Sequence, residues 1–223
     1  MVLIADSSAG ADVVFAQPSI KERNDIIGKV VAYEHHALGE LMLHHFLKKY
    51  DLTKDQVKTV DLTLSEQPQH FIDKHIDIAI TYYPEAWKIA KLESNELFNS
   101  REIPNTILDV LTIRTEVLAR NPAYACKAVE RHLQGVKVLK QNPLNSKYLL
   151  ASIMGLSDKE VVENLASLGI PSAVVNDQML RKEKAVHTIA AELQTILIKH
   201  NNIKQSISID QLFSAECLNR VME

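Results

Sequence analysis

The sequence predicts an α/β fold with a parallel-dominated sheet followed by a helical C-terminal region, and three observations support this. Of the 223 residues, 46% are hydrophobic, which is enough for a core and excludes an intrinsically disordered chain. Up to about residue 115, short apolar runs alternate with helical stretches, as in βαβ units. After Pro122, long helical runs replace this alternation. We therefore expect an α/β lobe over residues 1–115 and a helical region over residues 116–223.

Short apolar runs that end at turn residues indicate the strands. Residues 29–33 are β-branched and apolar on both faces, as in a buried parallel strand. Pro18 and Pro84 follow two other runs and end them, because proline cannot donate to a sheet ladder. The expected strands are residues 11–16, 29–33, 57–64, 76–82 and 107–115, with an extended segment at residues 96–103.

The helices are indicated by apolar periodicity and by capping residues. Ser65, Glu66 and Pro68 are typical of a helix start, and Ser157 with Glu160 forms the pattern of a capping box. The expected helices are residues 37–49, 85–93, 123–140, 145–154 and 183–200, with further helices that begin after Ser65 and at Ser157.

The composition excludes several classes of protein. The net charge is −3 and the pI is near 6.3, which argues against a nucleic-acid partner because such surfaces carry a clustered basic excess. No apolar run reaches the roughly 18–20 residues of a membrane span, and the first residues as given have no basic region of a signal peptide. The two cysteines, Cys126 and Cys217, do not form a disulfide framework. We expect two unpaired buried thiols, with a single bridge as the alternative.

Histidine offers the first candidate chemistry, since nine are present. His36, Glu40 and His44 are spaced i, i+4, i+8, so a helix could place them on one face as metal ligands. A helical wheel instead favours a solvent-exposed face with Glu40, His44 and Lys48. The opposite, buried stripe would contain Leu38, Leu41, Met42 and His45. No nucleophile elbow and no phosphate-binding loop occurs.

Three loops have the composition of a small-molecule site. Residues 6–12 combine Ser7 and Ser8 with a flexible Gly10 before a strand, and an ordinary turn is the alternative. Residues 34–36 lie where a strand ends and a helix begins, which is where open α/β sheets bind ligands. Residues 82–87 contain three aromatic side chains at an equivalent strand end, where they either wall a pocket or pack against a helix start.

Several segments, in order, resemble a known family. They are "DSSAGADVVFA", "IIGKVVAYEHHALGELMLHHFLKKYDL", "VKTVDLTLSEQPQHFIDKHIDIAITYYPEA" and "ARNPAYACKAVERHLQGVKVLKQNP". Over roughly residues 3–165 the sequence resembles the periplasmic substrate-binding proteins of ABC transporters for nitrate, sulfonate, taurine, bicarbonate and thiamine precursors. The matching positions include the Ser-x-Gly-Ala-Asp turn at residues 8–12 and the Gly-Lys-strand segment at residues 28–30.

The resemblance implies a fold and a set of site residues. The family folds as a two-lobed clamp, the type II periplasmic-binding-protein fold, which holds the ligand between its lobes. Transferred by position, the ligand-binding residues would be Ser7, Ser8, Gly10, Glu34, His35, His36, Tyr82, Tyr83 and Glu85. The resemblance also implies an ABC permease as partner, a periplasmic location, no cofactor and no catalytic residue.

This sequence departs from the family at His75, where the family has glycine, and in three further ways. Residues 34–36 are Glu-His-His where small residues are common in the family. The identity of the ligand therefore cannot be inferred from the relatives. The cysteine-rich motif of pyrimidine-synthase relatives is absent, which weakens an enzymatic interpretation. The family's signal peptide and first lobe would precede Met1, so we expect the chain to lack that lobe. Apolar surface left on the helices after Pro122 would then favour a homodimer.

Three hypotheses for function follow. The first is the solute-binding component of an ABC importer, which captures a small polar or anionic organic ligand. The second is a ligand-sensing effector domain of a regulator or receptor. The third is an enzyme that uses the Glu34, His35 and His36 cluster as acid–base or metal groups.

Overall fold

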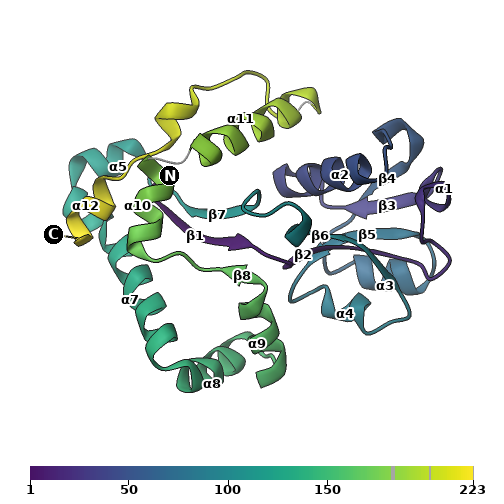
Figure 1. Cartoon of the computed structure of the whole chain (residues 1–223), viewed down its shortest axis with the longest axis horizontal. Coiled ribbons are helices and arrows are strands. Elements are labelled where there is room, and N and C mark those ends of the chain that lie inside the picture. The colour runs from purple at the N-terminus through teal and green to yellow at the C-terminus, as the bar shows by residue number, and fades with distance from the viewer. Residues whose placement is uncertain (182–183, 201, 223) are drawn as a thin grey trace. The chain divides into compact units, whose positions relative to one another are not determined.

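The computed structural model describes residues 1–181, 184–200 and 202–222 and has a mixed α/β fold with two sheets (Figure 1). The chain divides into two compact units. Unit 1 comprises Met1–Ser8, Leu108–Glu192 and Ile207–Glu223, and unit 2 comprises Ala9–Ile107 and Leu193–Ser206. Both units are discontinuous in sequence, so they differ from the two continuous ranges expected from composition. Among the described residues, no helix is long and apolar enough to cross a membrane.

Unit 2 contains a five-stranded sheet. Its order is β4 (Lys58–Asp61), β3 (Val30–Tyr33), β5 (Ile78–Tyr82), β2 (Asp12–Ala16) and β6 (Asn95–Asn99). β3 pairs in parallel with β4 and β5, whereas β2 pairs antiparallel with β5 and β6. The α/β class is therefore confirmed, but the sheet is mixed rather than parallel-dominated. The parallel part consists of the strands that crossover helices join, as such connections require.

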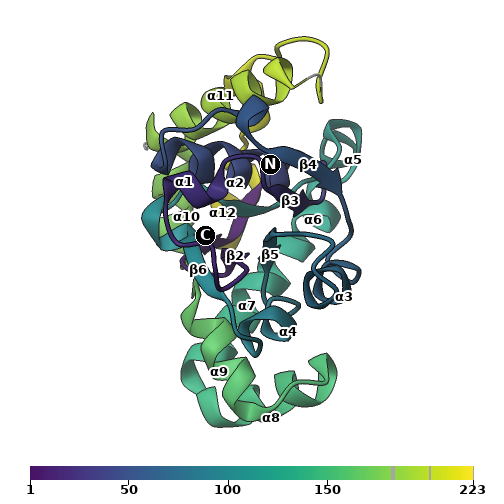
Figure 2. The ribbon, with the colours of Figure 1, turned by 90° about the vertical axis from the view of Figure 1, so that its right-hand side faces the viewer.

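Helices cover both faces of this sheet (Figures 1 and 2). α2 (Ala37–Lys49) packs on one face, and α3 (Gln67–Ile72) and α4 (Trp87–Ala90) pack on the other. Because side chains alternate along a strand, Val31 and Tyr33 of β3 join the α2 core whereas Ala32 joins the α3 and α4 core. The short elements of unit 2 are α1 (Arg23–Ile26), η1 (Lys54–Gln56) and η2 (Ser100–Glu102).

Unit 1 contains a small antiparallel sheet and most of the helices. The sheet order is β7 (Leu108–Leu111), β1 (Leu3–Ser8) and β8 (Leu168–Gly169). Asn176 is fully buried and pairs with β1: its Oδ1 accepts the Ile4 N–H at 2.7 Å and its Nδ2 donates to the Ile4 carbonyl at 3.0 Å. The helices are α5 (Thr115–Arg120), α6 (Pro122–Ala125), α7 (Lys127–Gln141), α8 (Pro143–Met154), α9 (Asp158–Ala166), α10 (Ala173–Arg181), α11 (Lys184–Lys199, which continues into unit 2), η3 (Ile209–Leu212) and α12 (Glu216–Met222).

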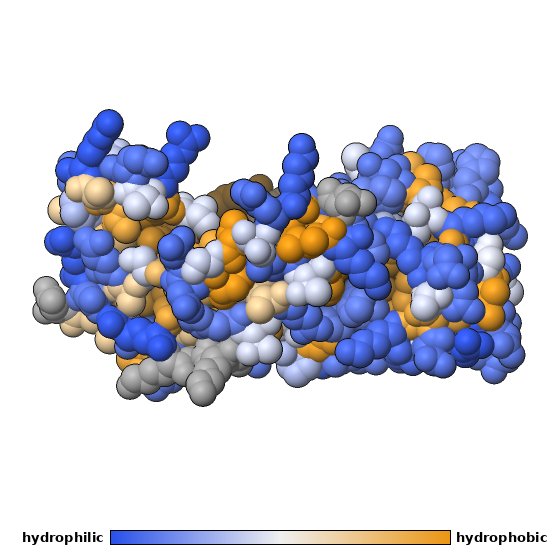
Figure 3. Space-filling view, turned by 90° about the horizontal axis from the view of Figure 1, so that it is seen from above, coloured by the Kyte–Doolittle hydropathy of each residue, from blue (hydrophilic) through white to orange (hydrophobic). Residues whose placement is uncertain are grey.

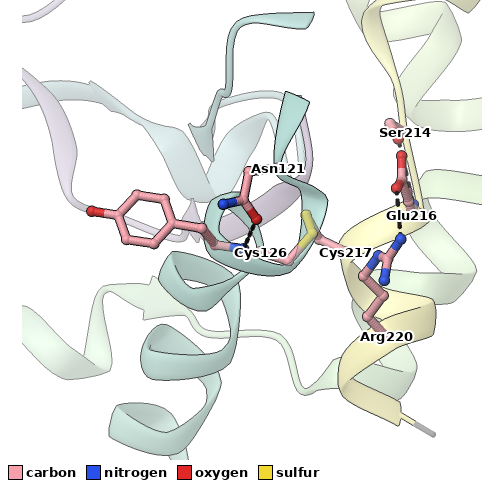
Figure 4. Close-up of a disulfide and its surroundings, with 7 residues drawn as sticks. Asn121, Cys126, Ser214, Glu216, Cys217 and Arg220 are labelled. Carbon is pink, nitrogen blue, oxygen red and sulfur yellow. Dashed lines mark hydrogen bonds and ion pairs between the residues drawn. A yellow bond between two sulfur atoms is a disulfide. The ribbon is translucent and has the colours of Figure 1, made fainter. Parts of the chain in front are cut away.

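Cys126 and Cys217 form a disulfide, so the expectation of two unpaired thiols is wrong (Figure 4). Cys126 ends α6 and Cys217 lies in α12, and their Cα atoms are 4.9 Å apart. Both are buried with Val129 and Leu218 in the core of unit 1. The two cysteines are separated by 91 residues in the sequence, and only the packing of α12 brings them together.

Several expected elements agree with the structure. α2 has the expected bounds, and the capping box at α9 is present, with Ser157 Oγ accepting the Glu160 N–H at 3.3 Å. The helix expected at residues 123–140 is two helices, α6 and α7, which meet at Cys126. The helix expected at residues 183–200 is α11, and Glu183, its expected first residue, lies outside the described residues. The elements β1, β8, α5, α10 and α12 were not expected.

Candidate functional site

The candidate site lies at the carboxyl edge of the parallel strands of unit 2. β3, β4 and β5 run in the same direction, so the segments that follow them meet at one edge of the sheet. Tyr33 and Asp61 are paired residues at the ends of β3 and β4. The Asp61 Oδ1 accepts the backbone N–H of His35 at 3.0 Å, which fixes the loop after β3 against the end of β4.

The side chains of Glu34 and His36 contact each other within this loop. The His36 Nε2 lies 2.9 Å from the Glu34 Oε2, and the Glu34 Oε1 accepts the Leu64 N–H at 3.3 Å. His36 is the N-cap residue of α2, but its side chain does not cap the helix. Glu34 therefore orients the imidazole at the N-terminus of a 13-residue helix, where the backbone N–H groups carry a partial positive charge.

Gly39 lets α2 approach this loop closely. A Cβ atom at residue 39 would lie 2.1 Å from the carbonyl oxygen of Glu34 and 2.7 Å from the Tyr33 ring. Any larger residue would have to displace the loop that carries Glu34 and His36. The requirement for glycine thus comes from close packing, and nothing in the local sequence pattern indicates it.

A narrow pocket opens at this edge. Its volume is about 10 Å³, roughly the room for one water molecule, so a larger solute would rest on its mouth. Asp12 and Thr81 are 5% and 3% exposed and contribute polar groups from β2 and β5. The full lining is Asp12, Glu34, His36, Leu38, Gly39, Met42, Leu64, Ile80, Thr81 and Tyr82.

The structure brings three of the predicted site residues to this pocket. Glu34, His36 and Tyr82 line it, and His35 lies between the first two in the same loop. Sequence reasoning missed Asp12, Gly39 and Thr81. Asp12 belongs to the turn motif that supports the family resemblance, so that motif could have indicated it. No sequence motif indicated Thr81.

Ser7 and Ser8 lie on β1 in unit 1, so their expected place in a turn is wrong. Ser7 pairs with Gly169 of β8, and its Oγ donates to the Gly169 carbonyl at 3.4 Å. The turn begins after them. Gly10 has φ +113°, which favours glycine, and its N–H donates to the Oγ of the buried Ser100 at 2.7 Å. Residues 3–8 are three apolar residues followed by three polar ones, so no alternation indicated this strand.

Tyr83 and Glu85 follow β5 and have local partners. The Tyr83 ring lies 4.4 Å from the Trp87 ring between centroids, on the face of the sheet that α3 and α4 cover. The Tyr83–Pro84 peptide bond is cis, and Glu85 forms an ion pair with Lys88. The three aromatic residues therefore do not form a single wall. Tyr82 lines the pocket, whereas Tyr83 packs on Trp87.

Glu40 does not belong to a solvent-exposed face, so that expectation is wrong. It is only 4% exposed, and its carboxylate accepts hydrogen bonds from Tyr33 OH at 2.8 Å and from Lys54 Nζ at 3.0 Å. Burial, together with the hydrogen bond to Glu40, raises the pKa of Tyr33 well above its ordinary value. Within the described part of the chain, no three His, Cys, Asp or Glu side chains are grouped as metal ligands.

The fold is similar to that of several solved structures. The periplasmic aliphatic sulphonate-binding protein SsuA from Escherichia coli matches with a TM-score of 0.72 and 17% identity over 95% of this chain and 68% of that protein. The alkanesulfonate-binding protein SsuA from Xanthomonas axonopodis pv. citri, bound to MOPS, matches with a TM-score of 0.60 and 18% identity over 87% and 69% of the two chains. The desulfurization enzyme DSZB matches with a TM-score of 0.66 and 13% identity over 99% and 78%.

The fold is therefore that of the substrate-binding proteins of ABC transporters. The chain belongs to the NMT1/THI5-like family, whose model matches residues 4–146. This confirms the resemblance found in the sequence. No curated protein matches the sequence.

Proposed function

We propose that this protein is the solute-binding component of an ABC-type importer of the nitrate, sulfonate and taurine class. In this proposal it captures a small polar or anionic organic solute and catalyses no reaction. The observation that carries the proposal is the N-terminus of α2 at the carboxyl edge of the sheet, where His35 and His36 stand beside the pocket. A helix N-terminus with adjacent imidazoles favours an anionic group.

The geometry supports a specific division of roles. An anionic group of the solute accepts hydrogen bonds from the first N–H groups of α2 and from the exposed His36 ring. Glu34 is a positioning residue that holds this ring, at 2.9 Å. Tyr82 provides an aromatic wall for the rest of the solute, and Asp12 and Thr81 accept or donate hydrogen bonds at the narrow base. Ser7, Ser8, Gly10, Tyr83 and Glu85 remain site predictions by resemblance.

The partner and the location are part of the same proposal. The solved relatives include periplasmic sulfonate-binding proteins, so we propose an ABC permease as partner and a periplasmic location. The Cys126–Cys217 disulfide supports an oxidising compartment, because such bonds persist there and are rare in the cytosol.

The homodimer also stays a proposal. It is supported by exposed apolar side chains on α8, where Leu149 and Ile153 are 62% and 71% exposed.

A second candidate function is catalysis, because one observation favours it. Glu34 and His36 form the carboxylate–imidazole pair that general acid–base catalysis uses, and the fold is similar to that of the enzyme DSZB. Incubation with a bound sulfonate and mass analysis of the recovered ligand separates the two functions. A solute carrier returns the ligand unchanged, whereas an enzyme returns a product.

Calorimetric titration tests the proposed function. We expect taurine or ethanesulfonate to bind the wild-type protein, and His36→Ala to weaken binding about tenfold through loss of one charge-assisted hydrogen bond. His75→Ala is the matched control, because His75 is exposed and precedes β5 at the opposite end of that strand. Equal loss of affinity in both variants, or none in His36→Ala, would contradict the proposal.

A further inference from the structure

Unit 2 contains a second pocket that shares no residue with the candidate site. It has a volume of about 280 Å³ and lies between the second half of α2, the loop that follows it and the C-terminal end of α11. Its apolar part comes from Leu43, Leu47 and Leu52. Figure 3 shows one face of the molecule, on which hydrophobic residues lie between hydrophilic ones.

The base of the pocket is a closed polar cluster. The buried Glu40 carboxylate accepts hydrogen bonds from Lys54 Nζ to both oxygens, each at 3.0 Å, and from Tyr33 OH. The His200 Nδ1 lies 3.8 Å from the same carboxylate. Lys54 therefore neutralises Glu40, and neither charge remains for a ligand.

The rim of the pocket has an excess of positive charge. Lys48 and Lys199 line it, and within the described residues neither lies within ion-pair distance of a carboxylate. Asp51 is the other acidic residue of the lining, so three lysines face two carboxylates. His44 and His200 add two imidazoles.

The protonation state of His200 is consistent with the positive charges around it. Burial lowers the pKa of His200, the Glu40 carboxylate raises it, and the positive charges of Lys54 and Lys199 lower it further. His200 is therefore neutral near pH 7, and an anion placed beside it would favour its protonated form. The groups that face His200 are Glu40 of α2, Lys54 of η1 and Lys199 of α11.

We propose that this pocket is a second ligand site, for a small organic carboxylate with an apolar body. The three leucines, each at most 6% exposed, close the floor beneath the body, and Lys48 and Lys199 bind the carboxylate, assisted by the imidazoles. The cavity, about 280 Å³ in volume, has room for such an organic body beside the cationic groups at its rim. The inference does not depend on the proposed function, because the two pockets have separate linings.

Histidine-resolved NMR titration with benzoate tests this site. Benzoate should bind the wild-type protein with a millimolar Kd, shift the His44 and His200 signals and raise the pKa of His200. Benzamide has the same body without the charge and should bind at least tenfold more weakly. The double variant Lys48→Gln and Lys199→Gln should weaken benzoate binding about tenfold, and the exposed Lys58→Gln on β4 should not.

Three outcomes would overturn the inference. They are equal binding of benzamide and benzoate, full benzoate affinity in the double variant, or shifts confined to His35 and His36. The comparison of benzoate with benzamide uses the wild-type protein, so it does not depend on the folding of a variant. His36→Ala should leave benzoate binding unchanged, which separates a failure at this pocket from a failure of the proposed function.

Discussion

Asp6 on β1 lies directly opposite Asp109 on β7, and the pKa of Asp6 is raised to about 6, first by burial and second by the negative charge of Asp109. In the unfolded chain this carboxyl ionises near its ordinary value of 3.8. The unfolded state therefore loses its proton before the folded state as pH rises. The contribution of Asp6 to stability is full below pH 4 and is lost as pH rises towards 6.

Asp6→Asn should therefore stabilise the protein at pH 7 and not at pH 4. The full shift corresponds to about 3 kcal/mol, but Asp6 is partly exposed and solvent screening reduces this to about 1 kcal/mol. Urea unfolding of both proteins between pH 4 and pH 7.5 measures the difference. A gain of the same size at both ends of this range would show that the ionisation of Asp6 is not its cause.

Asn176 should be important for the stability of unit 1. Asn176→Leu leaves the N–H and carbonyl of Ile4 buried without these partners, which should lower the free energy of unfolding by about 2–4 kcal/mol. Asn145→Leu is the matched control, because Asn145 is exposed on α8. Chemical denaturation gives both values, and a loss below about 0.5 kcal/mol for Asn176→Leu would refute the assigned role.

The disulfide should stabilise unit 1 by constraining the unfolded chain. Replacement of both Cys126 and Cys217 by serine should lower stability by about 2–4 kcal/mol, because the bond closes a long loop. Dithiothreitol should lower the stability of the wild-type protein by a similar amount and leave the variant unchanged. A thiol assay that finds two free cysteines in the protein from an oxidising compartment would contradict the pairing.

Gly39 and Gly135 provide a matched pair of helical glycines. Gly39→Ala should destabilise by about 1–3 kcal/mol and weaken solute binding, because the new Cβ atom overlaps the Glu34 carbonyl. Gly135→Ala in α7 meets no atom within 4 Å and should stabilise by about 0.5–1 kcal/mol. Thermal unfolding and calorimetry measure both effects. Equal effects of the two substitutions would show that α2 and the loop are not closely packed.

Local signals in the sequence predicted the elements that position the site. The bounds of α2 follow from its apolar periodicity, and the capping box of Ser157 and Glu160 follows from residue type alone. The strands β3 and β5 carry apolar residues on both faces because helices cover both faces of the sheet. These features set the place of Glu34 and His36 at the strand–helix junction.

Features that depend on distant partners could not be predicted from the sequence. Glu40 has the helical position of a surface residue, but Tyr33 and Lys54 bury its carboxylate. The pairing of Cys126 with Cys217 depends on where α12 packs, and no local pattern indicates that. In each case the decisive interaction joins segments that only the tertiary fold brings together.

The central claim is that solute binds beside His36 at the N-terminus of α2. Histidine-resolved NMR during titration with ethanesulfonate tests it most directly, because the nine histidines report on separate parts of the chain. The proposal predicts saturable shifts of His35 and His36, with His70 and His75 unchanged. Saturable binding that leaves His35 and His36 unshifted would contradict it.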